Sequence, residues 1–194
     1  SLMWGTASVR ALCRTARDFG YTRLALTDTD NLYGMWPFIA ACRDHGITPV
    51  IGAEITDPDT TDRAVCLVKS IKGYSSLTRM ITRRHREKKF CLKTDLPENS
   101  TGLVVMTRSP ELLKSWHNRG VDLAVNLARH PLSRHHPVCL AAAKREIPLV
   151  ATPGSYFLNP EDFKHHLMLR AIGKTTCLSR LARSDKAAGD AYLA

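Results

Sequence analysis

Hydrophobic and polar residues follow two patterns along this chain, and the two patterns alternate. The apolar residues of segment 8–20, such as Leu12 and Phe19, recur at helical spacing behind Ser8, which predicts an amphipathic helix with Ser8 as its N-cap. The next segment, 23–27, is a short and largely apolar run that is typical of a buried strand. The same patterns predict further helices over 35–44, 74–85, 110–117, 136–146 and 159–172, further strands over 48–52, 64–68, 103–106, 121–127 and 147–151, and loops over 57–62 and 93–100.

The alternation of short apolar strands with helices indicates an α/β fold. Such strands belong to parallel sheets whose faces are covered by helices, and a small barrel and a doubly wound sheet both fit. With 194 residues and no internal repeat or linker, the chain is expected to form one domain. Functional side chains of these folds gather where strands end, and the sequence there contains Asp28, Glu54, Thr107 and Thr152.

The charge balance adds an expectation about partners. Lys and Arg number 28 against 18 Asp and Glu, which gives a net charge of +10 and favours polyanions, nucleic acid first. One run is densest and has Glu87 as its only acid; its cations are Arg79, Arg83, Arg84, Arg86, Lys88, Lys89 and Lys93. The run predicts either a surface that contacts phosphates or a partner, or the solvated end of a helix. Because Phe90 is its only aromatic residue, we expect backbone contacts without base stacking.

Other features narrow the class of protein. No apolar run approaches the about 20 residues that span a bilayer, and no basic and apolar leader opens the chain, so we expect a cytoplasmic protein without membrane contact. The six cysteines are scattered without a C-x-x-C pair, which predicts buried free thiols in a reducing compartment. The motifs of P-loop kinases, Rossmann dehydrogenases and α/β-hydrolases do not occur.

Several segments, in order along most of the chain, resemble one family. The resemblance is to PHP (polymerase and histidinol phosphatase) domains, above all to the one that opens bacterial C-family polymerases, the DNA polymerase III alpha subunits. It implies a distorted (βα)7-type barrel of mainly parallel strands over residues 1–178, with 179–194 as a polar tail or the start of a following segment. The segments are 1–5 (SLMWG), 27–34 (TDTDNLYG), 46–54 (GITPVIGAE), 72–77 (KGYSSL), 147–152 (IPLVAT) and 156–162 (YFLNPED).

The resemblance also implies a chemistry from which this sequence departs. Active PHP domains hold a cluster of divalent metals, and a metal-bound hydroxide attacks a phosphate ester. The family's opening HxH pair is absent from the chain, and two further family histidines align with Thr29 and Arg63. A family cysteine falls near Ser109, and the late NDxH segment reads PGSY at 153–156. The departures predict a degenerate site without catalytic residues.

Three remnant ligands survive in this alignment: Asp28, Glu54 and His166. They imply no cofactor, or at most a weakly held zinc or manganese ion. Asp28 is interpreted either as a ligand or, with more weight, as the cap of the turn that comes after it. The fixed charge of Arg63 would repel cations and pair with Glu54 or Asp28, and we favour the pair with Glu54.

Three functions remain open on this basis. The leading hypothesis is a non-catalytic PHP domain of a DNA polymerase III alpha-type polymerase, a scaffold or DNA- and partner-binding module in replication, with other polymerase domains, replisome subunits or DNA as partners. The second is a residual metal-dependent phosphoesterase or 3′–5′ exonuclease. The third is a free-standing basic module that binds nucleic acid. The sequence leaves the oligomeric state open.

Overall fold

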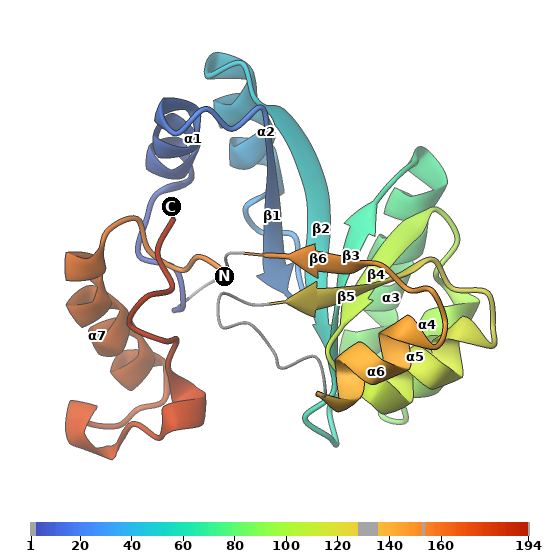
Figure 1. Cartoon of the computed structure of the whole chain (residues 1–194). Coiled ribbons are helices and arrows are strands. Elements are labelled where there is room, and N and C mark those ends of the chain that lie inside the picture. Colours follow the sequence, from blue (N-terminus) through green and yellow to red (C-terminus); the bar gives the residue numbers. More distant parts are fainter. Residues whose placement is uncertain (1–2, 128–135, 153, 194) are drawn as a thin grey trace. The chain divides into compact units, whose positions relative to one another are not determined.

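The computed structural model describes residues 3–127, 136–152 and 154–193 (Figure 1). The chain divides into two compact units. We call residues 25–32 and 50–152 the sheet unit, and residues 1–24, 33–49 and 153–194 the helical unit. No helix in the described ranges is long and apolar enough to cross a membrane.

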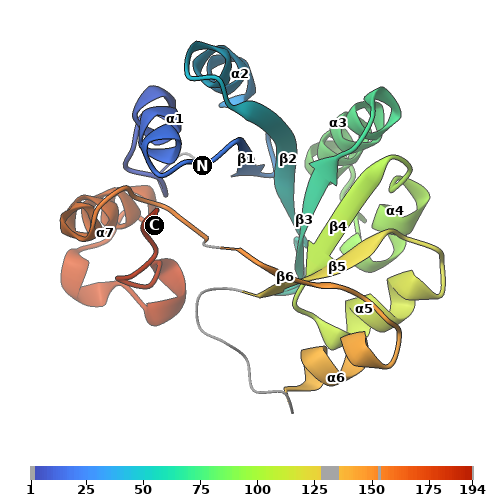
Figure 2. The same ribbon diagram turned by 45° about the horizontal axis from the view of Figure 1, so that its top comes forward.

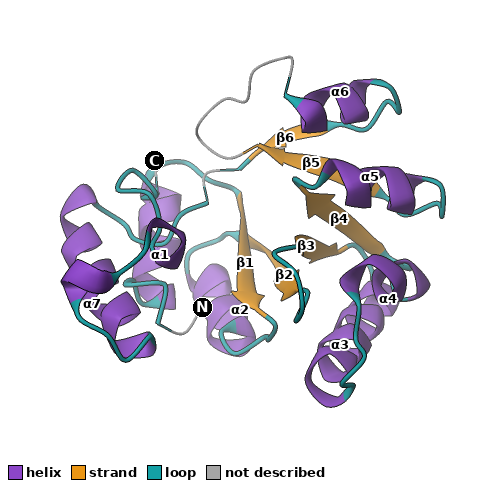
Figure 3. Ribbon diagram, turned by 90° about the horizontal axis from the view of Figure 1, so that it is seen from below, coloured by secondary structure: helices purple, strands orange, loops and turns teal. Residues whose placement is uncertain are grey.

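One curled sheet of six strands takes its strands in chain order (Figure 3). Strand β3, one of the two central strands, is antiparallel to both β2 and β4, whereas β4, β5 and β6 are parallel. Only a short loop of residues 57–62 joins β2 to β3, so no crossover helix fits there and β3 turns back. The expected α/β class with mainly parallel strands is confirmed, with β3 as the exception. The strands are β1 Arg23–Thr29, β2 Thr48–Thr56, β3 Arg63–Val68, β4 Leu103–Thr107, β5 Leu123–Leu127 and β6 Leu149–Ala151.

One side of the sheet unit is covered by helices (Figure 2). They are α3 Ile71–Arg86, α4 Leu92–Glu98, α5 Pro110–His117 and α6 Pro137–Ala143. Their apolar faces meet Ala53, Ile55 and Cys66 of β2 and β3 in one buried core, in which Phe90 and Trp116 are the largest aromatic residues. The indole of Trp116 donates to the Lys93 carbonyl at 3.0 Å, so its one polar atom is satisfied.

The helical unit contains α1 Val9–Asp18, α2 Met35–Asp44 and α7 Phe163–Gly173. Helix α1 begins as predicted, because the Ser8 side chain accepts from the Ala11 amide at 3.2 Å. Helices α1 and α2 pack through Cys13 and Cys42, two fully buried thiols whose sulfur atoms lie 3.6 Å apart. The six cysteines are all free thiols, and three of them are buried.

Helix α4 occupies part of a stretch that was predicted to be a loop, and that prediction was wrong. Leu92 and Leu96, four residues apart, are both fully buried. Two carboxylates satisfy the first amides of the helix: Cys91 donates to Asp95 at 2.7 Å and Leu92 donates to Asp57 at 2.8 Å. The second of these carboxylates comes from the loop between β2 and β3, so a local pattern could not reveal it.

Candidate functional site

Glu54 is the centre of the candidate site in the sheet unit. It lies within β2, two residues beyond the predicted end of that strand. Its Oε1 is 3.4 Å from an Arg63 guanidinium nitrogen, and its Oε2 accepts from the Thr29 hydroxyl at 3.2 Å. The predicted ion pair between Glu54 and Arg63 is therefore confirmed. Because 59% of the Arg63 side chain is exposed, the pair contributes only about 0–1 kcal/mol.

The neighbours of Glu54 come from the strands on either side. Thr29 ends β1, and Arg63 begins β3. In the register of β2 and β3, Glu54 faces Val65 and Thr56 faces Arg63, so Arg63 is a diagonal neighbour of Glu54 on the same face. Thus the two positions at which the resemblance expects histidines both contact the surviving glutamate.

Asp28 is buried, with 6% of its surface exposed. It lies inside β1, which continues to Thr29, and not in the turn that it was expected to cap. Successive side chains of a strand point to opposite faces of the sheet. Since Thr29 reaches Glu54, the pleat directs Asp28 to the other face.

Asp30, the first residue after β1, connects the end of this strand to β2. Its φ of +50° is the left-handed conformation that Asp tolerates better than most residues. Its carboxylate accepts from the Thr56 amide at 2.8 Å and from the Thr56 hydroxyl at 2.6 Å. Arg84 closes the group, with Nε 2.6 Å from the Thr56 carbonyl and Nη2 3.7 Å from Asp30.

His166 belongs to the helical unit, on α7, and is fully buried. Its Nε2 accepts from the Ala187 amide at 2.9 Å, so the proton is on Nδ1, which donates to the Trp4 carbonyl at 2.7 Å. Burial lowers the pKa of His166, the bond to Trp4 raises it, and the nearby charge of Arg170 lowers it, with a net decrease. Both ring nitrogens of this neutral imidazole are used by the backbone.

The described residues offer little to a metal cluster. Within residues 3–127, 136–152 and 154–193, no three His, Cys, Asp or Glu side chains are grouped as metal ligands would be. Ser109, near the family's cysteine, caps α5 by accepting from the Leu112 amide at 3.4 Å. Pro153, in the segment aligned with NDxH, lies outside the described residues. The donor set around Glu54, a hydroxyl and a guanidinium, does not fit a divalent cation.

The structure divides the predicted basic run into two groups. The guanidinium of Arg83 contacts Glu87 at 2.9 Å and Asp95 at 2.8 Å. Arg84 bonds to Thr56 of β2, so both of these arginines hold the fold together. The remaining cations of the run are exposed: Arg79, Arg86, Lys88, Lys89 and Lys93. The sequence could not separate the two groups, because Asp95, which contacts Arg83, and Thr56, which contacts Arg84, come from other elements.

Comparison with known sequences gives a family match and individual relatives that agree with one another. The family model that describes the PHP domain matches residues 1–127. The DNA polymerase III alpha subunit of Aquifex aeolicus is 24% identical over 95% of this chain. An error-prone DNA polymerase of Pseudomonas fluorescens is 36% identical over 55% of this chain. The chain spans only 20% of the length of the first relative and 10% of the second.

Comparison with solved structures supports the same fold. A protein of Bifidobacterium adolescentis assigned as a metal-dependent phosphoesterase has a TM-score of 0.54 at 15% identity, over 79% of this chain and 84% of the other. An amidohydrolase of Chromobacterium violaceum has a TM-score of 0.56 at 14% identity, over 81% of this chain and 85% of the other. At these identities the likeness concerns the fold alone.

Proposed function

Because this chain belongs to the PHP domain family, we propose that it is a non-catalytic PHP domain of a bacterial DNA polymerase III alpha-type polymerase. In this proposal it acts in the cytoplasm during DNA replication, as a scaffold for other polymerase domains or replisome subunits and as a contact to DNA. The length of the matched relatives supports a domain within a larger assembly, since each is several times longer than this chain.

The environment of Glu54 carries the proposal. Divalent cations in proteins are held by carboxylates, neutral imidazoles and thiolates. Here both oxygens of Glu54 have other partners, the Arg63 guanidinium and the Thr29 hydroxyl. Arg63 keeps its positive charge at any physiological pH and repels a cation from the carboxylate that it contacts.

The same contacts support a structural role for these positions. Thr29, Glu54 and Arg63 link β1, β2 and β3 through their side chains. His166 similarly links α7 to Trp4 and Ala187 in the helical unit. Residues aligned with the ligands of active family members thus connect neighbouring elements of the fold, which is what a scaffold requires.

Metal content tests this proposal. The purified protein, loaded separately with zinc and with manganese and then desalted, is expected to retain far less than one ion per chain by elemental mass spectrometry. It is also expected to leave 3′-labelled DNA and simple phosphate esters intact in the presence of either metal. One or more tightly held ions that are lost in Asp28→Ala or Glu54→Gln, together with metal-dependent hydrolysis, would instead support the residual phosphoesterase.

A gain-of-binding variant sharpens the test. In Thr29→His with Arg63→His, two imidazoles replace the hydroxyl and the guanidinium beside Glu54, so a three-ligand set becomes available. We expect this variant to retain zinc, to about one ion per chain, where the parent does not. The matched control carries Lys72→His and Lys114→His, two exposed positions on α3 and α5, and is expected to gain none. Equal zinc in both variants would show that the Glu54 position is not the remnant of a metal site.

A further inference from the structure

The turn between α3 and α4 carries an uncompensated positive charge. We call residues 86–93 the basic turn; its cations are Arg86, Lys88, Lys89 and Lys93, and all four are exposed. Within the ranges that the structure describes, none of these four side chains forms an ion pair. Over residues 79–98 the sequence has seven Lys or Arg and three acids.

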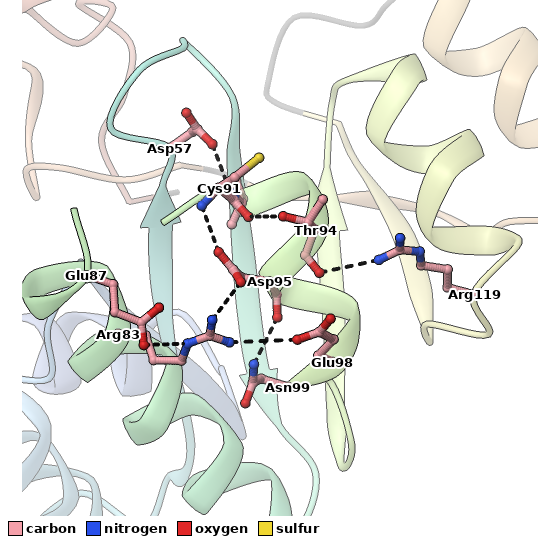
Figure 4. Close-up of polar contacts among 10 residues, drawn as sticks. Asp57, Arg83, Glu87, Cys91, Thr94, Asp95, Glu98, Asn99 and Arg119 are labelled. Carbon is pink, nitrogen blue, oxygen red and sulfur yellow. Dashed lines mark hydrogen bonds and ion pairs between the residues drawn. The ribbon is translucent and has the colours of Figure 1, made fainter. Parts of the chain in front are cut away.

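Three acids close in sequence to the basic turn contact Arg83 (Figure 4). The Arg83 guanidinium lies 2.9 Å from Glu87, 2.8 Å from Asp95 and 3.9 Å from Glu98. These are the three acids of residues 79–98. A single half-buried arginine therefore contacts these three acids, and a fourth nearby carboxylate, that of Asp57, accepts from the Leu92 amide of the turn at 2.8 Å. Among the described residues, none of the four acids forms an ion pair with the exposed cations of the basic turn.

The backbone of the basic turn is held in place by the rest of the sheet unit. Phe90 is 1% exposed and inserts its ring into the core. The Trp116 indole and an Arg119 guanidinium nitrogen donate to the carbonyls of Lys93 and Thr94, at 3.0 and 3.3 Å. A fixed backbone presents its cations without a large cost in chain ordering when a ligand binds.

Folding by itself does not favour a cation at the start of α4. Lys93 lies in the first turn of α4, where the positive end of the helix dipole favours acids. Lys88 and Lys89 follow Glu87, the C-cap of α3, where cations are favourable. The interpretation of the basic run as the solvated end of a helix therefore accounts for Arg86, Lys88 and Lys89 and leaves Lys93 unexplained.

We propose that the basic turn binds the phosphate backbone of duplex DNA without reading its sequence. Lys and Arg side chains that neutralise phosphates release condensed counterions, which supplies sequence-independent affinity. The one aromatic ring of the turn, Phe90, is in the core, so the turn has no platform on which the bases of a single strand would stack. The choice of DNA rests on the proposed role in replication, whereas the surface itself does not depend on metal.

A salt titration tests this inference on the 194-residue chain. Binding to a fluorescein-labelled duplex is followed by anisotropy at several salt concentrations, in EDTA. Four phosphate contacts predict a slope of about −3.6 for log K against log salt. The variant with Arg86→Gln, Lys88→Gln, Lys89→Gln and Lys93→Gln is expected to bind at least about 10-fold more weakly at low salt, with a slope near zero.

A second variant of the same net charge distinguishes binding by the basic turn from binding that depends on the net charge of the protein alone. It carries Arg14→Gln, Arg17→Gln, Lys144→Gln and Lys164→Gln, four exposed cations outside the basic turn, and has the same net charge as the first variant. We expect it to keep the slope of the parent. Equal losses of affinity in the two variants would overturn the inference. Full affinity in the variant of the basic turn would also overturn it, and would direct attention to a protein partner for this surface. Because EDTA is present, none of these outcomes depends on the metal measurement that tests the proposed function.

Discussion

His166 illustrates how a residue aligned with a catalytic ligand becomes part of the fold. Its pKa is lowered in the folded protein, whereas in the unfolded chain the pKa stays at its ordinary value of 6.5. The unfolded state therefore binds the proton more readily, so the stabilisation is complete above pH 6.5 and is lost as the pH falls through the folded-state pKa. Histidine titrates between about pH 5 and about pH 8. Urea denaturation at several pH values in this range, monitored by circular dichroism, should show the free energy of unfolding fall as the pH is lowered.

Two variants isolate the contribution of His166. His166→Gln loses the buried hydrogen bonds of the imidazole, so we expect its free energy of unfolding to be about 1–3 kcal/mol lower at the upper pH. Because glutamine does not titrate, the stability of this variant should also depend less on pH. His165→Gln is the matched control, because the side chain of His165 is 70% exposed and lies 3.6 Å from Asp162. An unchanged pH dependence in His166→Gln would contradict the assignment of the titration to this buried ring.

A sequence reveals the partner of a residue more readily when the two are close in the chain and oppositely charged than when they are far apart. The Glu54–Arg63 pair could be predicted, because a guanidinium at a position that the resemblance aligns with a histidine needs an acid and Glu54 is close in the chain. The partners of His166 could not, since the Trp4 carbonyl is 162 positions away and the second partner is an amide that any residue possesses. Asp28 was predicted to cap a turn and lies within β1, because the strand extends two residues beyond its apolar run.

Among the elements, helices α2 and α5 could be predicted to the residue, whereas α3 begins three residues before its predicted start and α6 ends three residues before its predicted end. Helix α4 was not predicted. The boundaries of α2 and α5 agree with their predictions because Gly46 and the Ser109–Pro110 pair are local signals. Helix α4 depends on Asp57 and Asp95, of which the first lies 35 positions from its amide partner Leu92. An element of seven residues with an internal proline has too little local preference to be recognised alone.

Helix α4 also provides a test of whether Lys93 favours DNA binding at the expense of stability. Lys93→Glu places an acid in the first turn of α4, so we expect it to raise the free energy of unfolding by about 0.3–1 kcal/mol at low ionic strength. The same change should weaken binding to duplex DNA. Lys114→Glu is the matched control, because Lys114 is an exposed lysine in the last turn of α5, where a cation is favourable, and its loss should destabilise. Urea denaturation measures both, and a destabilised Lys93→Glu would contradict the electrostatic argument.

At the scale of the whole molecule, the expected polar tail is tied into the helical unit. Residues Phe157 and Tyr192 form a β-bridge, and the Leu193 amide donates to the Phe157 carbonyl at 3.1 Å. The Ala187 amide donates to His166, and Arg170 donates to the Asp185 carbonyl at 2.7 Å. The tail therefore satisfies two buried polar side chains of α7, which the weak pattern of its own residues did not indicate.

These tail contacts predict that a chain ended at residue 178, the boundary that the resemblance implies, has a less stable helix α7. Without the tail, His166 and Arg170 each lose a buried partner, and each loss costs about 1–3 kcal/mol. Hydrogen exchange measured by mass spectrometry should show faster exchange in α7, with α3 and α5 of the sheet unit unchanged. The full chain with Arg183→Gln, an exposed change within the tail, should exchange like the parent. If α7 kept its protection in the shortened chain, the domain would end at residue 178, and the tail contacts would add nothing to its stability.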